Sequence, residues 1–184
     1  NQIFSTSAAF AALKDDGSVV TWGSTDRGYE FGGDSSSVAA QLSSGVNQIF
    51  SANSAFAALK DDGSVVSWGL SEYGGDSSSV DLELSSGVNQ IFSTDYAFAA
   101  VKDDGSVVTW GSDYGGDSSS VDLELSSGVN QIFSTTSAFA ALKDDGSVVT
   151  WGADYWGGDS SSVADQLSSG VVSFADPFHD DRLI

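Results

Sequence analysis

Apolar and polar positions follow one pattern that recurs four times along the chain. In its last complete copy, at 139–152, it reads Phe-Ala-Ala-Leu-Lys, then Asp-Asp-Gly, then Ser-Val-Val-Thr-Trp-Gly, and earlier copies begin at Phe10, Phe56 and Phe98. The two runs are rich in alanine, β-branched and aromatic residues, and the glycine between them supplies the positive φ that a tight turn requires. The pattern therefore predicts a β-hairpin in each copy.

Both faces of this hairpin are predicted to be apolar. Side chains alternate along a strand, so Phe139 and Ala141 point to one face while Ala140 and Leu142 point to the other. A sheet that is apolar on both faces must be covered on both faces. One copy cannot bury enough surface to fold alone, so we expect neighbouring copies to stack on it.

The spacing of the copies predicts the architecture. Asn-Gln-Ile-Phe-Ser begins at Asn1, Asn47, Asn89 and Asn130, which are 46, 42 and 41 residues apart. Repeats of about 40 to 50 residues with several short strands are typical of β-propeller blades, and the 3.6-residue period of helical arrays is absent. We therefore predict an all-β, β-propeller-type fold of about four blades. The expected repeat domain spans 1–171, with repeats at 1–46, 47–88, 89–129 and 130–171.

Each repeat is expected to contain three strands, and the sequence does not decide whether a fourth strand follows them. The strands are Gln-Ile-Phe-Ser, Phe-Ala-Ala-Leu-Lys and Ser-Val-Val-Thr-Trp-Gly. Further along, the apolar residues of 80–84 alternate as in an edge strand, whereas Val38 and Leu42 of the first copy have the spacing of a helical turn. Blades of three or of four antiparallel strands are both compatible with the sequence.

The last thirteen residues, 172–184, break the pattern. They keep apolar residues at both ends but place Pro177 and charged residues between them. We interpret them as a degenerate half-repeat that caps the array, because an uncovered blade exposes strand edges. Either this segment closes a small ring as a clasp, or two chains associate as a homodimer to complete a larger ring.

Composition excludes several classes of partner. The net charge of −20 comes from 26 acidic and 6 basic residues and repels nucleic acid and anionic lipid. The chain has no cysteine, and no apolar run approaches the roughly 20 residues that span a bilayer, so neither disulfides nor membrane insertion is expected. Because methionine is absent and the chain begins inside a repeat, we interpret it as a piece of a longer protein.

The segment Ser137–Gly152, SAFAALKDDGSVVTWG, together with the preceding Gly128-Val129 and Gln131–Ser134, resembles the repeat of the regulator of chromosome condensation (RCC1) family. The resemblance covers nearly the whole chain. It departs after Trp-Gly, where Gly-Gly-Asp-Ser-Ser-Ser replaces the usual Gly-Gln-Leu-Gly-like segment, which affects the outer part of the blade. The resemblance implies a propeller and the bacterial surface-protein or β-lactamase-inhibitor branch, with a secreted or surface location. Functions in the family are diverse, so only the fold transfers directly.

Candidate binding residues lie where the copies differ. One variable loop follows the first strand and another follows Trp-Gly, where a tyrosine recurs beside acidic residues. Exposed aromatic residues on loops of a rigid scaffold are typical of surfaces that recognise proteins or glycans. The alternatives are that these residues only cover blade edges, or that the repeats serve structure and self-assembly. The candidates are Tyr29, Phe31, Tyr73, Tyr96, Tyr114, Tyr155 and Trp156.

Metal binding and catalysis are weakly supported. The repeated Gly-Gly-Asp resembles calcium-binding Gly-Asp repeats, but those stack every nine residues, whereas these recur more than forty residues apart. The Asp-Asp pairs fit turn chemistry. His179, the single histidine, lies among Asp176, Asp180 and Asp181 and is expected to be a solvated residue, with a weak metal site as the alternative. No nucleophile elbow, phosphate loop or zinc spacing is present, so we expect neither an enzyme nor a cofactor.

Overall fold

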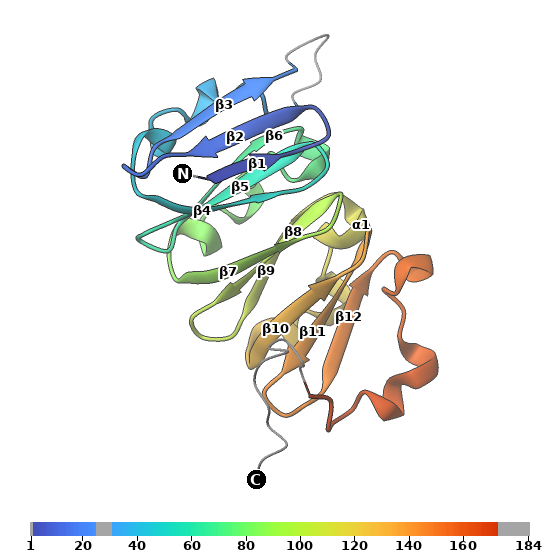
Figure 1. Cartoon of the computed structure of the whole chain (residues 1–184). Coiled ribbons are helices and arrows are strands. Elements are labelled where there is room, and N and C mark those ends of the chain that lie inside the picture. The colour runs from blue at the N-terminus through green and yellow to red at the C-terminus, as the bar shows by residue number, and fades with distance from the viewer. Residues whose placement is uncertain (1, 25–30, 173–184) are drawn as a thin grey trace, which may run out of the picture.

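The computed structural model describes residues 2–24 and 31–172. Within them, the chain forms four antiparallel three-stranded sheets, and each sheet contains consecutive strands of one repeat (Figure 1). The all-β prediction is confirmed. The strands are β1 (Gln2–Ser5), β2 (Ala9–Leu13), β3 (Val19–Gly23), β4 (Val46–Ser51), β5 (Ala55–Lys60), β6 (Val65–Gly69), β7 (Val88–Ser93), β8 (Ala97–Lys102), β9 (Val107–Gly111), β10 (Val129–Ser134), β11 (Ala138–Lys143) and β12 (Val148–Gly152).

The hairpin in each repeat is set by its turn and by one aromatic pair. In the second repeat, Gly63 has φ 76°, and its N–H donates to the carbonyl of Lys60 at 3.0 Å, which closes the turn between β5 and β6. This register places Phe56 opposite Trp68, and their rings stack with centroids 5.2 Å apart. The same Phe–Trp pair occurs in all four sheets.

The segment after each sheet is helical, so the edge-strand alternative for residues 80–84 is wrong. Two 3-10 helices, η5 (Ser78–Val80) and η6 (Glu83–Ser85), occupy this stretch. Leu84 is buried between repeats while Leu82 is 87% exposed, which is the pattern of a helical turn. Equivalent short helices follow the other sheets: η2 (Ser36–Val38), η3 (Gln41–Ser43), η7 (Ser119–Val121), η8 (Glu124–Ser126) and η10 (Ser161–Gln166). Another short helix follows Trp-Gly directly in the second, third and fourth repeats: η4 (Ser71–Tyr73), α1 (Asp113–Gly116) and η9 (Asp154–Trp156).

The sheets stack face to face, and the core is divided among the joints between successive repeats. One cluster joins the first and second repeats, another the second and third, and a last one the third and fourth. In each, a Phe–Trp pair of the later repeat packs on alanines and leucines of the earlier one. At the middle joint, Phe98 and Trp110 contact the face that carries Ala57 and Leu59. The predicted two-faced burial is confirmed.

A glycine makes each joint close. Gly74 of the second repeat has φ 89°, and a Cβ there would lie 2.6 Å from Cδ2 of Phe98 in the third repeat. The indole Nε1 of Trp110 donates to the Gly74 carbonyl at 3.1 Å, so the same glycine contacts both aromatic residues of its neighbour. The first Gly of each Gly-Gly-Asp is therefore part of the packing between blades.

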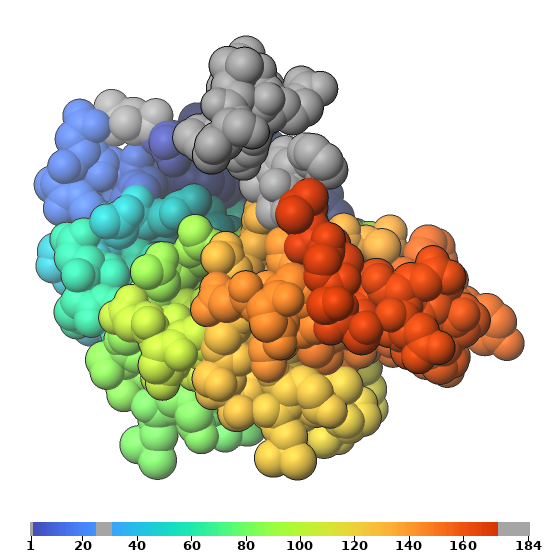
Figure 2. Space-filling model, turned by 90° about the horizontal axis from the view of Figure 1, so that it is seen from below, coloured from blue at the N-terminus to red at the C-terminus, as the bar shows by residue number. Residues whose placement is uncertain are grey.

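The four repeats follow one another around an arc (Figure 2). The expected half-repeat, 172–184, lies outside the described residues except for Val172, so its role as cap or clasp stays a prediction. Among the helices in the described ranges, none has the length and hydrophobicity needed to cross a membrane.

Candidate functional site

Strand order brings both variable loops of every repeat to one end of the stack. Within a three-stranded antiparallel sheet, the loop after the first strand and the segment after the third must lie together, opposite the Asp-Asp-Gly turn. Main-chain hydrogen bonds join the two: Leu70 N–H donates to Ser54 O at 2.9 Å, and Ser112 N–H to Tyr96 O at 3.0 Å. We call this end the variable end; its described residues are 6–8, 24, 52–54, 70–73, 94–96, 112–114, 135–137 and 153–156.

The first loops of successive repeats are linked by main-chain hydrogen bonds alone. Ser7 N–H donates to Asn53 O at 2.8 Å, Asn53 N–H to Asp95 O at 2.9 Å, and Asp95 N–H to Thr136 O at 3.0 Å. All four side chains differ, and none takes part. The variable end thus rests on a continuous main-chain frame.

Three of the candidate tyrosines form one cluster on this frame. The ring of Tyr96 lies between those of Tyr73 and Tyr114, with centroid distances of 5.2 and 6.4 Å. Tyr73 comes from the second repeat and the other two from the third. Tyr73 also packs partly on the core between these repeats, whereas Tyr114 is 62% exposed. We call Tyr73, Tyr96 and Tyr114 the tyrosine cluster.

The remaining candidates are placed differently. Tyr155 is fully exposed and Trp156 is about half exposed, at 101% and 54%, and they lie in η9 of the last repeat. Phe31 is half-buried, and its carbonyl accepts a hydrogen bond from the Thr6 hydroxyl at 3.0 Å. Tyr29 lies outside the described residues.

Both ends of the stack carry acidic residues, but the lysines lie at only one of them. Acidic residues stand beside the tyrosines at the variable end: Glu72, Asp95, Asp113 and Asp154. Every lysine of the chain directly precedes an Asp-Asp-Gly turn and so lies at the opposite end, at Lys14, Lys60, Lys102 and Lys143. Within the described part of the chain, the variable end therefore carries negative charge without a lysine to balance it.

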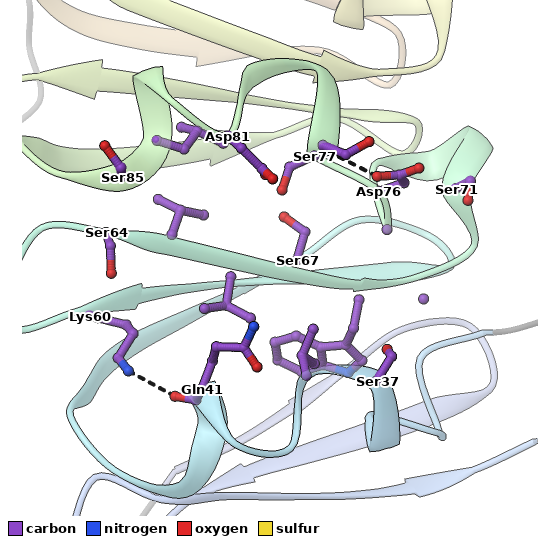
Figure 3. A pocket seen from close by; sticks show the side chains of 18 of the residues that line it. Ser37, Gln41, Lys60, Ser64, Ser67, Ser71, Asp76, Ser77, Asp81 and Ser85 are labelled. Carbon is purple, nitrogen blue, oxygen red and sulfur yellow. Dashed lines mark hydrogen bonds between the residues drawn. The ribbon is translucent and has the colours of Figure 1, made fainter.

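A polar hollow lies beside β6, between the first two repeats. It has a volume of about 590 Å³, and Ser67, Ser77 and Asp81 line it (Figure 3). The buried hydroxyl of Ser67 has no hydrogen-bond partner there. The other repeats carry threonine at this position; Thr109, for instance, donates to Gly116 O at 2.9 Å and to the Ser118 hydroxyl at 3.1 Å. Sequence comparison of the repeats could have found this Ser-for-Thr difference.

The repeated aspartates stabilise turns. The Asp16 carboxylate accepts from the hydroxyl and the N–H of Ser18 at 2.6 and 3.0 Å, and these bonds, the hydroxyl first, lower the pKa of Asp16 from 3.8 to about 2. In the Gly-Gly-Asp segment, Asp76 accepts from the Ser78 N–H at 2.9 Å, which likewise lowers the Asp76 pKa. Turn chemistry thus accounts for both sets, and calcium binding, which the sequence supports only weakly, is not tested by this geometry.

No cluster of three or more His, Cys, Asp or Glu side chains suited to a metal occurs within 2–24 and 31–172. His179 and its acidic neighbours Asp176, Asp180 and Asp181 lie beyond these ranges. The expectation that the chain is not an enzyme is not tested by this geometry.

Comparison with known proteins gives the fold but no sequence family. No protein-family model matches the chain, and no curated protein matches it. Among solved structures, Prp20p from Saccharomyces cerevisiae superposes with a TM-score of 0.55 at 16% identity, over 82% of this chain and 44% of Prp20p. Prp20, described as yeast RCC1, in complex with Kap60 gives the same TM-score at 15% identity, over 82% of this chain and 43% of Prp20.

A human protein, WBSCR16, superposes over 94% of this chain and 53% of its own, with a TM-score of 0.51 and 20% identity. The chain therefore spans less than half the length of the Prp20 structures and about half of WBSCR16. Four three-stranded sheets stacked in sequence order, together with these structural matches, show that the chain has an RCC1-like β-propeller fold.

Proposed function

We propose that the chain is a non-catalytic protein-binding module and that the tyrosine cluster is the centre of its recognition surface. The observation that carries the proposal is the meeting of Tyr73, Tyr96 and Tyr114, from two repeats, in one partly exposed cluster. Tyrosines contribute large contact area at low conformational cost and are enriched among residues that dominate binding energy. The main-chain frame beneath them holds their loops in place before a partner arrives.

The charge around the cluster favours a basic partner. Each tyrosine of the cluster directly follows an acidic residue in the sequence, namely Glu72, Asp95 or Asp113, and the lysines lie at the other end of the repeats. Complementary charge accelerates encounter and rejects partners of like charge. We therefore propose a protein segment rich in Lys and Arg as the ligand, whose association slows as salt is added.

The solved neighbours support a protein ligand. Prp20p is described by its binding properties to Gsp1p and histones, and another structure shows Prp20 bound to Kap60. At 15–16% identity these matches support the fold and the class of partner only. A glycan stacking on the tyrosines is the other outcome of the test below.

The test compares the chain with two variants in one screen. A phage-displayed peptide library and a glycan array are exposed to the chain and to the double variant Tyr96→Ser/Tyr114→Ala. Tyr96→Ser keeps the fold, because the second and fourth repeats carry serine there, at Ser54 and Ser137. Tyr155→Ala, at an exposed tyrosine outside the cluster, is the matched control.

We expect the chain and the Tyr155→Ala control to enrich Lys- and Arg-containing peptides, and the double variant to lose them with an unchanged melting temperature. Enrichment of a glycan instead of these peptides would show that the ligand is a carbohydrate and not a basic protein segment. Equal enrichment by all three proteins would refute the site.

We also propose a second copy of the chain as a partner, in a homodimer that completes the ring. Its support is that the first and last repeats each leave apolar residues uncovered within the described part of the chain, among them Phe10, Trp22 and Phe133. Sedimentation mass tests the dimer, and a mass of one chain at all concentrations would refute it.

A further inference from the structure

The first repeat leaves uncovered the face that every later repeat buries. Ile49, Ile91 and Ile132 are 2–3% exposed, whereas the equivalent Ile3 is 68% exposed. The Phe–Trp pairs of the later repeats are at most 3% exposed, and Phe10 and Trp22 are both 44% exposed. We call the uncovered residues Ile3, Phe10, Val20 and Trp22 the leading face.

The last repeat leaves uncovered the surface on which, at each joint, the leading face of the next repeat packs. In the first three repeats, a Cβ added to the first glycine of Gly-Gly-Asp would lie close to the phenylalanine of the next repeat, at 2.7 Å for Gly32, 2.6 Å for Gly74 and 3.3 Å for Gly115. A Cβ added at Gly157, the equivalent glycine of the last repeat, would have no atom within 4 Å. Leu167 is only half-buried, although its counterparts in earlier repeats are 2% exposed. We call Phe133, Gly157, Val163 and Leu167 the trailing face.

Hydrogen bonds across the joints stop at these same two faces. The indole of a later repeat donates to the glycine carbonyl of the earlier one at 3.0–3.1 Å at all three joints. Within the described residues, Trp22 has no such acceptor and the Gly157 carbonyl has no such donor. The main-chain series at the variable end likewise ends with the Thr136 N–H on one side and the Ser7 carbonyl on the other.

A lysine contact repeats the pattern. Lys60 donates to Gln41 O at 2.8 Å, and Lys102 and Lys143 donate in the same way to carbonyls of the connector before their repeat. Within the described residues, Lys14 has no such connector carbonyl as acceptor and instead pairs with Asp16 on its own turn. The connector of the last repeat offers the equivalent carbonyl at Gln166.

We propose that the leading face of one copy docks on the trailing face of a second copy, and that two such joints close two chains into a ring of eight repeats. In this joint Phe10 of one copy covers Gly157 of the other, and Trp22 Nε1 donates to the Gly157 carbonyl. Lys14 reaches Gln166 O, and Thr136 N–H donates to Ser7 O. The proposal deepens the homodimer proposed above and is independent of the tyrosine cluster.

A second copy is the fitting occupant because the chain already makes this joint three times. Each group on the leading face has a complementary group on the trailing face: Phe10 has the space at Gly157, and the indole N–H of Trp22 has the Gly157 carbonyl. The Ser7 carbonyl likewise has the Thr136 N–H. Head-to-tail contact of this kind closes a ring when the rotation per unit allows it. The arc of four repeats and the 44% coverage of Prp20p, a single chain of the same fold, agree with half a ring (Figure 2).

The test begins with the mass of the 184-residue chain in solution, by light scattering and native mass spectrometry. We expect twice the chain mass of 18.9 kDa. Added salt should strengthen this association, because each copy carries a net charge of −20. Binding of a basic peptide at the tyrosine cluster would weaken with salt, so failure of one proposal can be told from failure of the other.

Substitutions on the two faces then identify the joint. The leading-face variant Phe10→Asp/Trp22→Asp and the trailing-face variant Phe133→Asp/Val163→Asp alter side chains that are already 39–46% exposed, so each chain should keep its fold, checked by circular dichroism. Each alone should raise the dimer dissociation constant by about a hundredfold or more. Mixed together they should recover a dimer, since one intact joint forms between them. Leu82→Asp, at an exposed leucine on neither face, is the control and should dimerise like the parent.

A disulfide gives an independent measurement, because the chain has no cysteine of its own. Ser7→Cys/Thr136→Cys should form a covalent dimer on oxidation, and neither single variant should. A monomeric parent, dimers that persist in both face variants, a ladder of higher masses, or dimerisation that requires deletion of 173–184 would each overturn the two-copy ring.

Discussion

Substituting Gly74 by alanine tests whether packing between repeats holds the array together. Gly74 has φ 89°, a left-handed conformation that costs an L-residue roughly 1–2 kcal/mol. Its new Cβ would also lie 2.6 Å from Cδ2 of buried Phe98, so the ring or the backbone must move. Overpacking of this kind adds about 1–3 kcal/mol.

Gly157 is the matched control within the same molecule. Its φ is 102°, and a Cβ there meets nothing within 4 Å. Gly157→Ala therefore shares the cost of the backbone conformation but has no clash within one chain. We expect the free energy of unfolding to fall by about 1–3 kcal/mol more in Gly74→Ala than in Gly157→Ala.

Urea unfolding, followed by tryptophan fluorescence and circular dichroism, measures the difference. It should be carried out at a concentration where the chain is monomeric, because Gly157 is also placed in the proposed joint between copies. An equal fall in the free energy of unfolding of the two variants would show that Gly74 is needed only for its backbone conformation and not for packing against Phe98. The account of blade packing given above would then be wrong.

Further predictions concern the hydrogen bonds. Ser67→Thr should raise stability by about 1 kcal/mol, because the added methyl group limits χ1 and directs the buried hydroxyl to the carbonyl of Gly75 and the hydroxyl of Ser77, which are equivalent to the partners of Thr109. Ser67→Val has the same shape but no hydroxyl and should not raise stability; thermal unfolding measures both. Because the pKa of Asp16 is lowered from 3.8 to about 2 in the folded state, its contribution to stability should be complete above about pH 4 and lost between pH 4 and 2. Ser18→Ala should return this pKa toward its usual value in an NMR titration, and an unchanged value would refute the assigned cause. Trp110→Phe should lower stability by about 1 kcal/mol or more in urea unfolding, because the buried Gly74 carbonyl loses its indole donor; no change would mean that the bond contributes nothing.

The hairpins and their stacking could be predicted because the signal is local. Alternation in Phe139–Leu142 assigns each side chain to a face, and Asp-Asp-Gly fixes the register that pairs Phe139 with Trp151. The helical segment could not be decided in this way. Alternating Val80, Leu82 and Leu84 fit a strand as well as a helical turn, and only tertiary packing shows that Leu84 is buried and Leu82 is not.

The candidate site was predicted by residue type but not by grouping. Tyr73 and Tyr114 belong to the loop after Trp-Gly, whereas Tyr96 belongs to the other variable loop. The cluster exists because stacking places the loop of one repeat beside that of the next, a relation that sequence does not contain until the fold is known. Tyr155 resembles Tyr73 in sequence, but no later repeat follows within the described residues to supply a partner like Tyr96.

The main-chain hydrogen bonds that link Ser7, Asn53, Asp95 and Thr136 allow the side chains of these loops to vary while the backbone path is kept. Four unlike side chains occupy equivalent positions, yet the bonds that link them use only atoms common to every amino acid except proline. New residues can therefore be tried at these tips while the underlying polypeptide path is preserved. In the proposed recognition module, substitutions at the variable end would therefore change specificity while the fold is kept, as in the hypervariable loops of antibodies. Proline, which has no N–H to donate, is the substitution that we expect these positions to reject.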